Sequence, residues 1–178
     1  MVLPEEDKYS VTRSQMQGQL SYMLGGRAAE ELIFHDPTTG ASNDIEKATS
    51  VARAMVTQYG MTERLGAVRY GQSGGDVFLG RDLGHQRDYS EDVAASIDIE
   101  VRELIETAHY EAYEVLVENR AILDALVVEL MEKETLDKDD IARIFAKVKV
   151  RPSKAPWTGS KKRKPSRKPP VAIKADKK

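Results

Sequence analysis

The chain of 178 residues has no cysteine, a single tryptophan, only three histidines and no long apolar run. Without cysteine it can form no disulfide, no thiolate metal site and no cysteine nucleophile. A membrane helix needs about 20 predominantly apolar residues, and no stretch approaches that length. The first ten residues are polar and carry three acids, which is unlike a signal peptide. We therefore expect a soluble chain with no transmembrane segment.

Several catalytic motifs are missing as well. No G-x-x-x-x-G-K-[ST] loop is present, so this chain is not expected to bind ATP. There is neither a G-x-S-x-G nucleophile elbow nor a zinc-binding H-E-x-x-H pattern, and His35, His85 and His109 lie far apart in the sequence. The glycine-rich run 71–75 lacks the context of a phosphate loop and is interpreted as a turn. The sequence thus predicts no catalytic residue within this chain.

Charge is distributed very unevenly along the chain. The formal net charge is -2, but residues 151–178 hold eleven Lys or Arg and one acid, which leaves residues 1–150 at -12. Five of the seven prolines also lie in this C-terminal stretch. Such a composition buries too little apolar surface to order itself. The sequence predicts an acidic domain over 1–150 and a disordered basic tail over 151–178.

Apolar residues at spacings of three and four predict a helix over 12–34. Thr12 and Gln15 match a capping box, in which each end satisfies a backbone N–H of the other. The predicted apolar stripe is Met16, Leu20, Met23, Leu24, Ala28 and Leu32. Gly25 and Gly26 interrupt it at a cost of up to about 1 kcal/mol each. We expect close approach of another backbone to compensate.

A second helix is predicted over 42–59, with Ser42 as its N-cap and Gly60 in the left-handed stop position. Residues 61–89 are rich in glycine and predict loops with one or two short strands. Further helices are expected from Ser90, after a break at Asn119, and from Asp137. These last three helices predict a C-terminal helical bundle, and the fold class is mainly α.

The segment 38–44, Thr-Thr-Gly-Ala-Ser-Asn-Asp, is the best candidate for chemistry. Taken alone, it is a loop, a helix cap and an acid in the first helical turn. The positive end of a helix favours a carboxylate there, which explains Asp44 without any ligand. An ionised carboxylate is also what zinc accepts as a ligand, at about 2.0–2.2 Å. Both interpretations of Asp44 remain open at this point.

Three segments, in this order and spacing, resemble the FtsH-type family of membrane-anchored AAA+ zinc proteases. They are Leu-Gly-Gly-Arg-Ala-Ala-Glu-Glu at 24–31, the segment 38–44, and Met-Val-Thr-Gln-Tyr-Gly-Met at 55–61. Shorter similarities at 78–81 and 132–136 extend the resemblance over residues 3–147. The basic tail lies outside it.

The resemblance implies that Asp44 is the family's third zinc ligand. The other two ligands are histidines of an HExxH helix, whose Glu is the general base. That helix, the ATP-binding module and the transmembrane helices lie upstream in the family. The implied function is the C-terminal part of an ATP-dependent zinc metalloendopeptidase, which degrades membrane and unfolded proteins as a hexameric ring at the cytoplasmic face of the cell membrane. The isolated chain is expected to be inactive.

Other polar residues have two interpretations each. Glu30 is either a carboxylate that orients a ligand histidine or a solvated side chain paired with Arg27. His35 is either a residue that approaches the metal or, as we expect, a surface loop residue. Asn43 either hydrogen-bonds within the loop or caps the helix, and His109 is expected in packing or at the surface. The tail predicts at most weak contact with anionic lipid and no specific nucleic acid, because Trp157 is its only aromatic residue.

An alternative function stays open beside the protease. The chain would then be a non-catalytic helical scaffold that assembles with, or regulates, full-length protease subunits.

Overall fold

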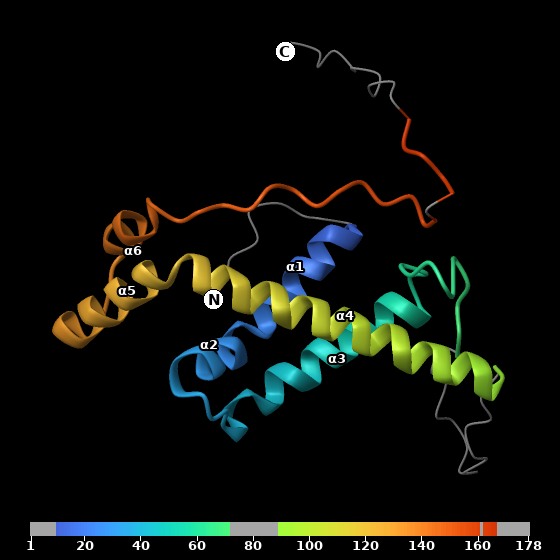
Figure 1. The fold of residues 1–178 in the computed structure, drawn as a ribbon, viewed down its shortest axis with the longest axis horizontal. Helices are drawn as coiled ribbons and strands as arrows, with labels where there is room; N and C mark the ends of the chain where they lie inside the picture. The colour runs from blue at the N-terminus through green and yellow to red at the C-terminus, as the bar shows by residue number, and fades with distance from the viewer. Residues whose placement is uncertain (1–9, 72–88, 161, 167–178) are drawn as a thin grey trace, which may run out of the picture.

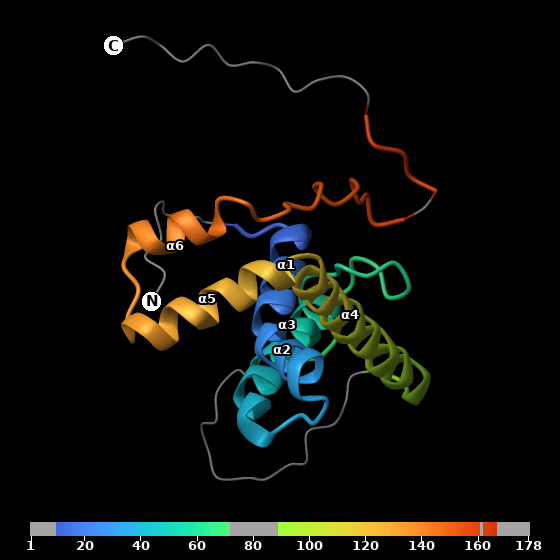
Figure 2. The ribbon, with the colours of Figure 1, turned by 60° about the vertical axis from the view of Figure 1, so that its left-hand side comes forward.

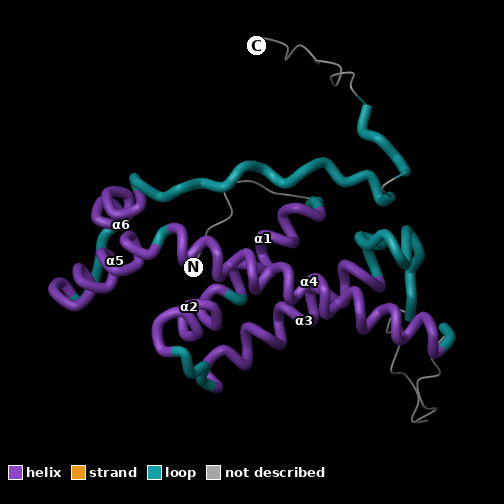
Figure 3. The backbone as a smooth tube through the Cα atoms, viewed as in Figure 1, coloured by secondary structure: helices purple, strands orange, loops and turns teal. Residues whose placement is uncertain are grey.

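The computed structural model describes residues 10–71, 89–160 and 162–166. Within these ranges the chain folds into helices with no strand (Figure 3). In chain order they are α1 (Arg13–Met23), α2 (Gly25–Phe34), the 3-10 turn η1 (Thr39–Ala41), α3 (Ser42–Thr57), α4 (Glu91–Glu118), α5 (Arg120–Lys133) and α6 (Lys138–Phe145). The predicted mainly α class is confirmed. Residues 61–71 contain no strand, and the remaining candidates for strands, in 72–88, lie outside the described residues.

None of these described helices combines the length and the apolar character that crossing a bilayer requires.

The predicted helix over 12–34 is divided at Leu24 into α1 and α2. The capping box is present, since Thr12 Oγ1 accepts from the Gln15 N–H and Gln15 Oε1 accepts from the Thr12 N–H. Among the described residues the expected backbone neighbour of Gly25 and Gly26 is not found, because an added Cβ would meet nothing within 4 Å at either position. This prediction was wrong. Gly25 and Gly26, which are weak helix formers, instead come directly after Leu24, where α1 and α2 divide.

The start of α3 also differs from the prediction. Ser42 is the first helical residue and not the N-cap, with φ -56° and ψ -44°. An N-cap needs a non-helical, typically extended backbone, but η1 leads directly into α3 and holds Ser42 in helical geometry. At the other end, Gly60 has φ +59° and Met61 N–H donates to the Met55 carbonyl, as expected of a left-handed stop.

Helix α4 is the centre of the fold and packs against α1, α2 and α3 (Figure 2). The largest fully buried side chains come from three of these helices: Leu20, Met55, Val56 and Ile97. Burying one such side chain contributes about 1.5–3 kcal/mol to stability. The buried side of α4 consists of Ile97, Val101, Leu104, Ala108 and Ala112. Ser90 caps this helix by accepting from the Val93 N–H.

Helices α5 and α6, hereafter the arm, lie side by side at one end of the molecule (Figures 1 and 2). Asn119 and Asp137 stand at the predicted helix boundaries. No residue of α5 is buried. Helix α4 packs mainly with α1–α3, whereas α5 and α6 pair with each other, so the bundle expected of the last three helices is reduced to this pair.

Candidate functional site

Asp44 lies in the first turn of α3, directly after the loop formed by Asp36–Thr38 and η1. Its side chain is partly buried, and it makes no hydrogen bond or ion pair with the rest of the described chain. The N-terminal end of α3 carries partial positive charge, which favours an ionised carboxylate. The chain thus presents a carboxylate that no described side chain neutralises.

Glu30 on α2 holds the loop that leads to Asp44. Its Oε2 accepts a hydrogen bond from the Thr38 N–H at 2.9 Å, and its Oε1 accepts one from Thr38 Oγ1 at 2.8 Å. Thr38 Oγ1 in turn accepts from the Gly40 N–H at 3.1 Å. Both carboxylate oxygens are therefore engaged in fixing the loop relative to α2.

The pKa of Glu30 lies below its ordinary value. The hydrogen bond from the Thr38 backbone is the main cause, followed by the bond from the Thr38 hydroxyl, while partial desolvation opposes them. Charged acceptors form stronger hydrogen bonds than neutral ones. The contact consequently keeps its full strength at neutral pH.

Gly40 allows this loop to close tightly. A Cβ at this position would stand 3.2 Å from Thr38 Oγ1 and 3.8 Å from Glu30 Oε1. The first distance is closer than ordinary van der Waals contact, so a side chain would push against the Thr38 hydroxyl that Glu30 holds.

The neighbouring carboxylate, Glu31, serves a different contact. Arg27 Nε donates to Glu31 Oε1 at 2.8 Å, and His109 Nε2 lies 3.2 Å from Glu31 Oε2. The His109 contact is close enough for an ion pair but lacks hydrogen-bond geometry, since Nε2 has no hydrogen-bond partner. This group joins α2 to α4 and leaves Glu30 free for the loop.

His35 ends α2 in a left-handed conformation, with φ 57°. It is exposed, as predicted, and its Nδ1 lies 3.1 Å from the Glu31 carbonyl oxygen. This contact occupies one ring nitrogen in capping the helix end.

The described residues contain no group of three His, Cys, Asp or Glu that could hold a metal ion. A catalytic zinc site uses three protein ligands, of which a carboxylate is an accepted type. The carboxylate of Asp44 is thus of a type that zinc accepts, but the described residues around it form no complete ligand set.

Sequence reasoning identified Asp44 and Glu30 as candidates but missed how they are connected. Thr38 is the missing link, because it binds Glu30 through both its backbone and its hydroxyl. A threonine two residues before a glycine is a known signal for a side-chain turn, but the partner eight residues upstream has no local signature.

Comparison with known proteins gives the family. The model of peptidase family M41 matches residues 1–144, and the chain belongs to this family. The curated relatives are ATP-dependent zinc metalloproteases named FtsH. The chain is 57% identical to that of Cutibacterium acnes, 56% to that of Rhodococcus erythropolis and 55% to that of Mycobacterium tuberculosis, each over 171 residues. These findings confirm the FtsH-type family given by the resemblance.

Each of those matches covers 96% of this chain but only 20–24% of the relative. The chain thus spans between a fifth and a quarter of the length of these relatives. A match of 171 residues is longer than residues 1–150, so it takes in part of the basic C-terminal stretch as well. The relative from Rubrobacter xylanophilus, 52% identical, matches over 150 residues.

Proposed function

We propose that the chain is the part of an ATP-dependent zinc metalloendopeptidase that supplies one zinc ligand, Asp44, and the helical scaffold behind the active site. Residues 1–150 are the peptidase part. The HExxH helix, the ATPase that binds ATP and the membrane-spanning helices belong to other parts of the complete protein. That protein forms a hexameric ring at the cytoplasmic face of the cell membrane and degrades membrane and unfolded proteins.

The single observation that carries this proposal is the free carboxylate of Asp44 at the start of α3, behind a loop that Glu30 holds. A ligand must be ionised and must be kept in place before the metal arrives. Asp44 lies at the positive end of the α3 dipole, and the two bonds from Thr38 to Glu30 fix the loop before it. The names of the relatives support zinc and ATP dependence.

A zinc ion held there with Asp44 as one ligand would supply Lewis-acid chemistry, which activates water and polarises a carbonyl. Asp44 is the only residue of the present chain to which we assign a direct part in that chemistry. Glu30 acts one step further out, by positioning the loop. The chain alone is therefore inactive, because both ligand histidines and the general base lie outside it.

The decisive experiment is Asp44→Asn in the complete protease. Asparagine keeps the shape of the side chain but removes its charge. If Asp44 binds zinc, proteolysis of an unfolded substrate is lost, while ATP hydrolysis and ring assembly survive. If Asp44 only favours the helix dipole, the variant loses about 0.3–1 kcal/mol of stability and keeps its activity.

Asp92→Asn is the matched control. Asp92 occupies the first turn of α4 and faces the same kind of helix terminus, with no proposed metal role. It should lose a similar increment of stability and no proteolysis. Near wild-type proteolysis by Asp44→Asn would remove Asp44 from the active site.

A second candidate is the non-catalytic scaffold that assembles with or regulates full-length subunits. The arm favours it, because α5 and α6 expose apolar side chains, including Val128 at 56% and Met131 at 81%. Exposed apolar patches mark contact surfaces. Adding the purified chain to active full-length protease separates the two functions. A scaffold should change the rate of proteolysis in proportion to the amount of chain added. A catalytic part that lacks its ligand histidines should leave the rate of proteolysis unchanged.

A further inference from the structure

The basic residues 151–160 and 162–166, hereafter the segment, lie along the acidic helix α4. Arg151 makes a double contact with Glu118, with Nε 3.1 Å and Nη2 2.6 Å from the two carboxylate oxygens. Glu114 lies 3.8 Å from the same guanidinium. One turn of α4 further back, Lys154 Nζ donates to Glu111 Oε2 at 2.7 Å. The segment thus lies along a stripe of glutamates that recur about one helical turn apart.

The segment then reaches α1. Ser21 of α1 donates to the same Glu111 oxygen at 2.9 Å. The Trp157 ring lies under the guanidinium of Arg13, 4.8 Å from ring centroid to Cζ. Arg13 is itself fixed, because its Nε donates to the Met61 carbonyl at 2.9 Å. Trp157 of the segment therefore stacks against Arg13, a cation that a contact elsewhere in the domain already holds in place.

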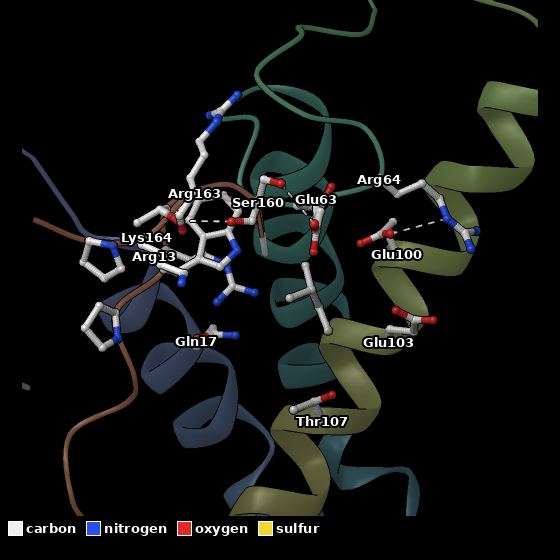
Figure 4. Close-up of a pocket in the computed structure, with 16 residues that line it drawn as sticks. Arg13, Gln17, Glu63, Arg64, Glu100, Glu103, Thr107, Ser160, Arg163 and Lys164 are labelled. Carbon is white, nitrogen blue, oxygen red and sulfur yellow. Dashed lines mark hydrogen bonds and ion pairs between the residues drawn. The ribbon is translucent and has the colours of Figure 1, made fainter.

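A cavity of about 940 Å³ lies under the far end of the segment (Figure 4). Trp157, Arg163 and Lys164 line it on the side of the segment, and Glu100 and Glu103 line it on the side of α4. Trp157 remains 39% exposed. The ion pairs of Arg151 and Lys154 and the stacking of Trp157 on Arg13 are therefore the contacts by which the segment meets α4 and α1.

We infer that the face formed by Glu111, Glu114 and Glu118 of α4, with Arg13 of α1, is a docking surface for a basic, tryptophan-containing segment. Its occupant is the chain's own segment, through Arg151, Lys154 and Trp157, bound as a latch that increasing ionic strength releases.

Charge supports this choice of occupant. Residues 151–178 carry a net +10 against -12 for the preceding 150 residues, and each contact joins opposite charges, Arg151 to Glu118 and Glu114, and Lys154 to Glu111. The bond from Arg151 is the main cause that lowers the pKa of Glu118. For Glu111, partial burial would raise the pKa, but the hydrogen bonds from Lys154 and Ser21 outweigh it. Both carboxylates are thus matched to cations in the docked state.

The latch also closes the base of the arm. The Lys149 N–H donates to Asn119 Oδ1 at 2.8 Å, beside the pair of Arg151 with Glu118. The chain leaves α4 at Asn119 and returns to it at Arg151, so this pair of contacts sets the direction of α5 and α6. Release of the segment loosens the arm and exposes the glutamate stripe.

Trp157 is the only tryptophan in the sequence, so its fluorescence reports on the latch alone. The test is a sodium chloride titration of the full chain at neutral pH, followed by Trp157 emission and by circular dichroism at 222 nm. The screening length falls from about 10 Å at 0.1 M salt to about 3 Å at 1 M. We expect the emission to shift to longer wavelength and quenching by acrylamide to increase, while the helical signal stays constant.

Exchanging the charges of Arg151 and Glu118 tests whether this ion pair holds the segment on α4. Arg151→Glu should give the high-salt emission already at low salt, and adding Glu118→Arg to it should restore docking. The control is Arg120→Glu, which breaks an exposed pair with Asp124 on α5 outside the docking surface and should change nothing. The inference would be overturned if Trp157 already emitted like the tryptophan of a free peptide at low salt. It would also be overturned if neither salt nor Arg151→Glu changed the Trp157 emission. A dependence on protein concentration would also overturn it, by making the occupant the segment of a second copy.

Discussion

Glu30 and Thr38 are joined by two hydrogen bonds, one from the Thr38 backbone and one from its hydroxyl, so that α2 holds the loop before α3. The consequence concerns how the loop before Asp44 is held in place. We expect the position of Asp44 to depend on a carboxylate fourteen residues earlier in the chain, because that carboxylate holds the loop before α3. A change at Glu30 should therefore act on the site without removing any ligand.

Glu30→Gln tests this dependence in the complete protease. Glutamine offers one acceptor oxygen where the two Thr38 donors need two, so the loop should loosen. Partners that orient a metal ligand typically contribute 10–100-fold to affinity or activity, and we expect a fall of that order in proteolysis and zinc affinity. Glu31→Gln is the control, since Glu31 contacts Arg27 and His109 instead of the loop. Equal losses in both variants would contradict a specific role for Glu30.

Zinc should bind the isolated chain weakly. Three protein ligands make a catalytic site, and the chain offers one proposed ligand, Asp44. Isothermal calorimetry should detect no tight site, and the zinc-supplemented chain should leave an unfolded protein uncut. Stoichiometric tight binding that Asp44→Ala abolishes would contradict the prediction and assign further ligands to this chain.

Alanine substitutions at Gly60 and Gly26 should change the stability of the chain in opposite directions. At Gly60 a Cβ would lie 2.7 Å from the Ala67 Cα and 2.8 Å from the Gly66 carbonyl oxygen, in a left-handed backbone. Gly60→Ala should lose at least about 1–3 kcal/mol. Gly26→Ala meets open space inside a helix and should gain up to about 1 kcal/mol. Thermal unfolding measures both, at about 2–4 °C per kcal/mol for a chain of this size.

Gly18→Ala is the control for Gly26→Ala. Gly18 lies inside α1 and is also open, so it should give a similar gain. A loss at Gly26 with a gain at Gly18 would show that the division at Leu24 needs a glycine beside it.

Glu100 should make the stability of the chain depend on pH. Burial is the main cause that raises its pKa, and Glu103 and Glu63 add to it, while Arg64 and Arg13 oppose it. An acid whose folded pKa is raised destabilises the fold above that pKa, and the penalty vanishes as pH falls toward the unfolded value of about 4.3. Glu100→Gln should therefore raise the unfolding midpoint at pH 7–8 by about 1–3 °C.

The advantage of Glu100→Gln should shrink as the pH falls toward about 4.3. Thermal scans at several pH values, with exposed Glu106→Gln as the control, measure it. A variant that is less stable than the parent at pH 7 would mean that the pairing with Arg64 outweighs the cost of burial.

The local signals in the sequence predicted the fold well. Thr12, Ser90 and Asp137 each accept a backbone N–H three residues ahead, and Gly60 takes the left-handed conformation. These features depend only on residues within one helical turn, so the sequence contains all the information needed.

Features that depend on distant partners were not predictable in this way. The docking of Arg151 on Glu118 joins residues 33 apart, and composition alone favoured disorder for that segment. Composition measures how much apolar surface a segment can bury, whereas this contact uses charge on another helix. Ser42 was misassigned because nothing local to it reveals that η1 continues into α3.

Asn119 and Lys149 are neighbours although thirty residues separate them, which makes the arm an insert with adjoining ends. Such an insert can be excised and its ends rejoined by a short turn, or exchanged for the arm of a relative, with little rearrangement of α1–α4. Each halving of the connection reduces the entropy cost of closing it by about 0.6 kcal/mol. Chimaeras made at this junction would allow whatever the arm recognises to be transplanted separately from the peptidase scaffold.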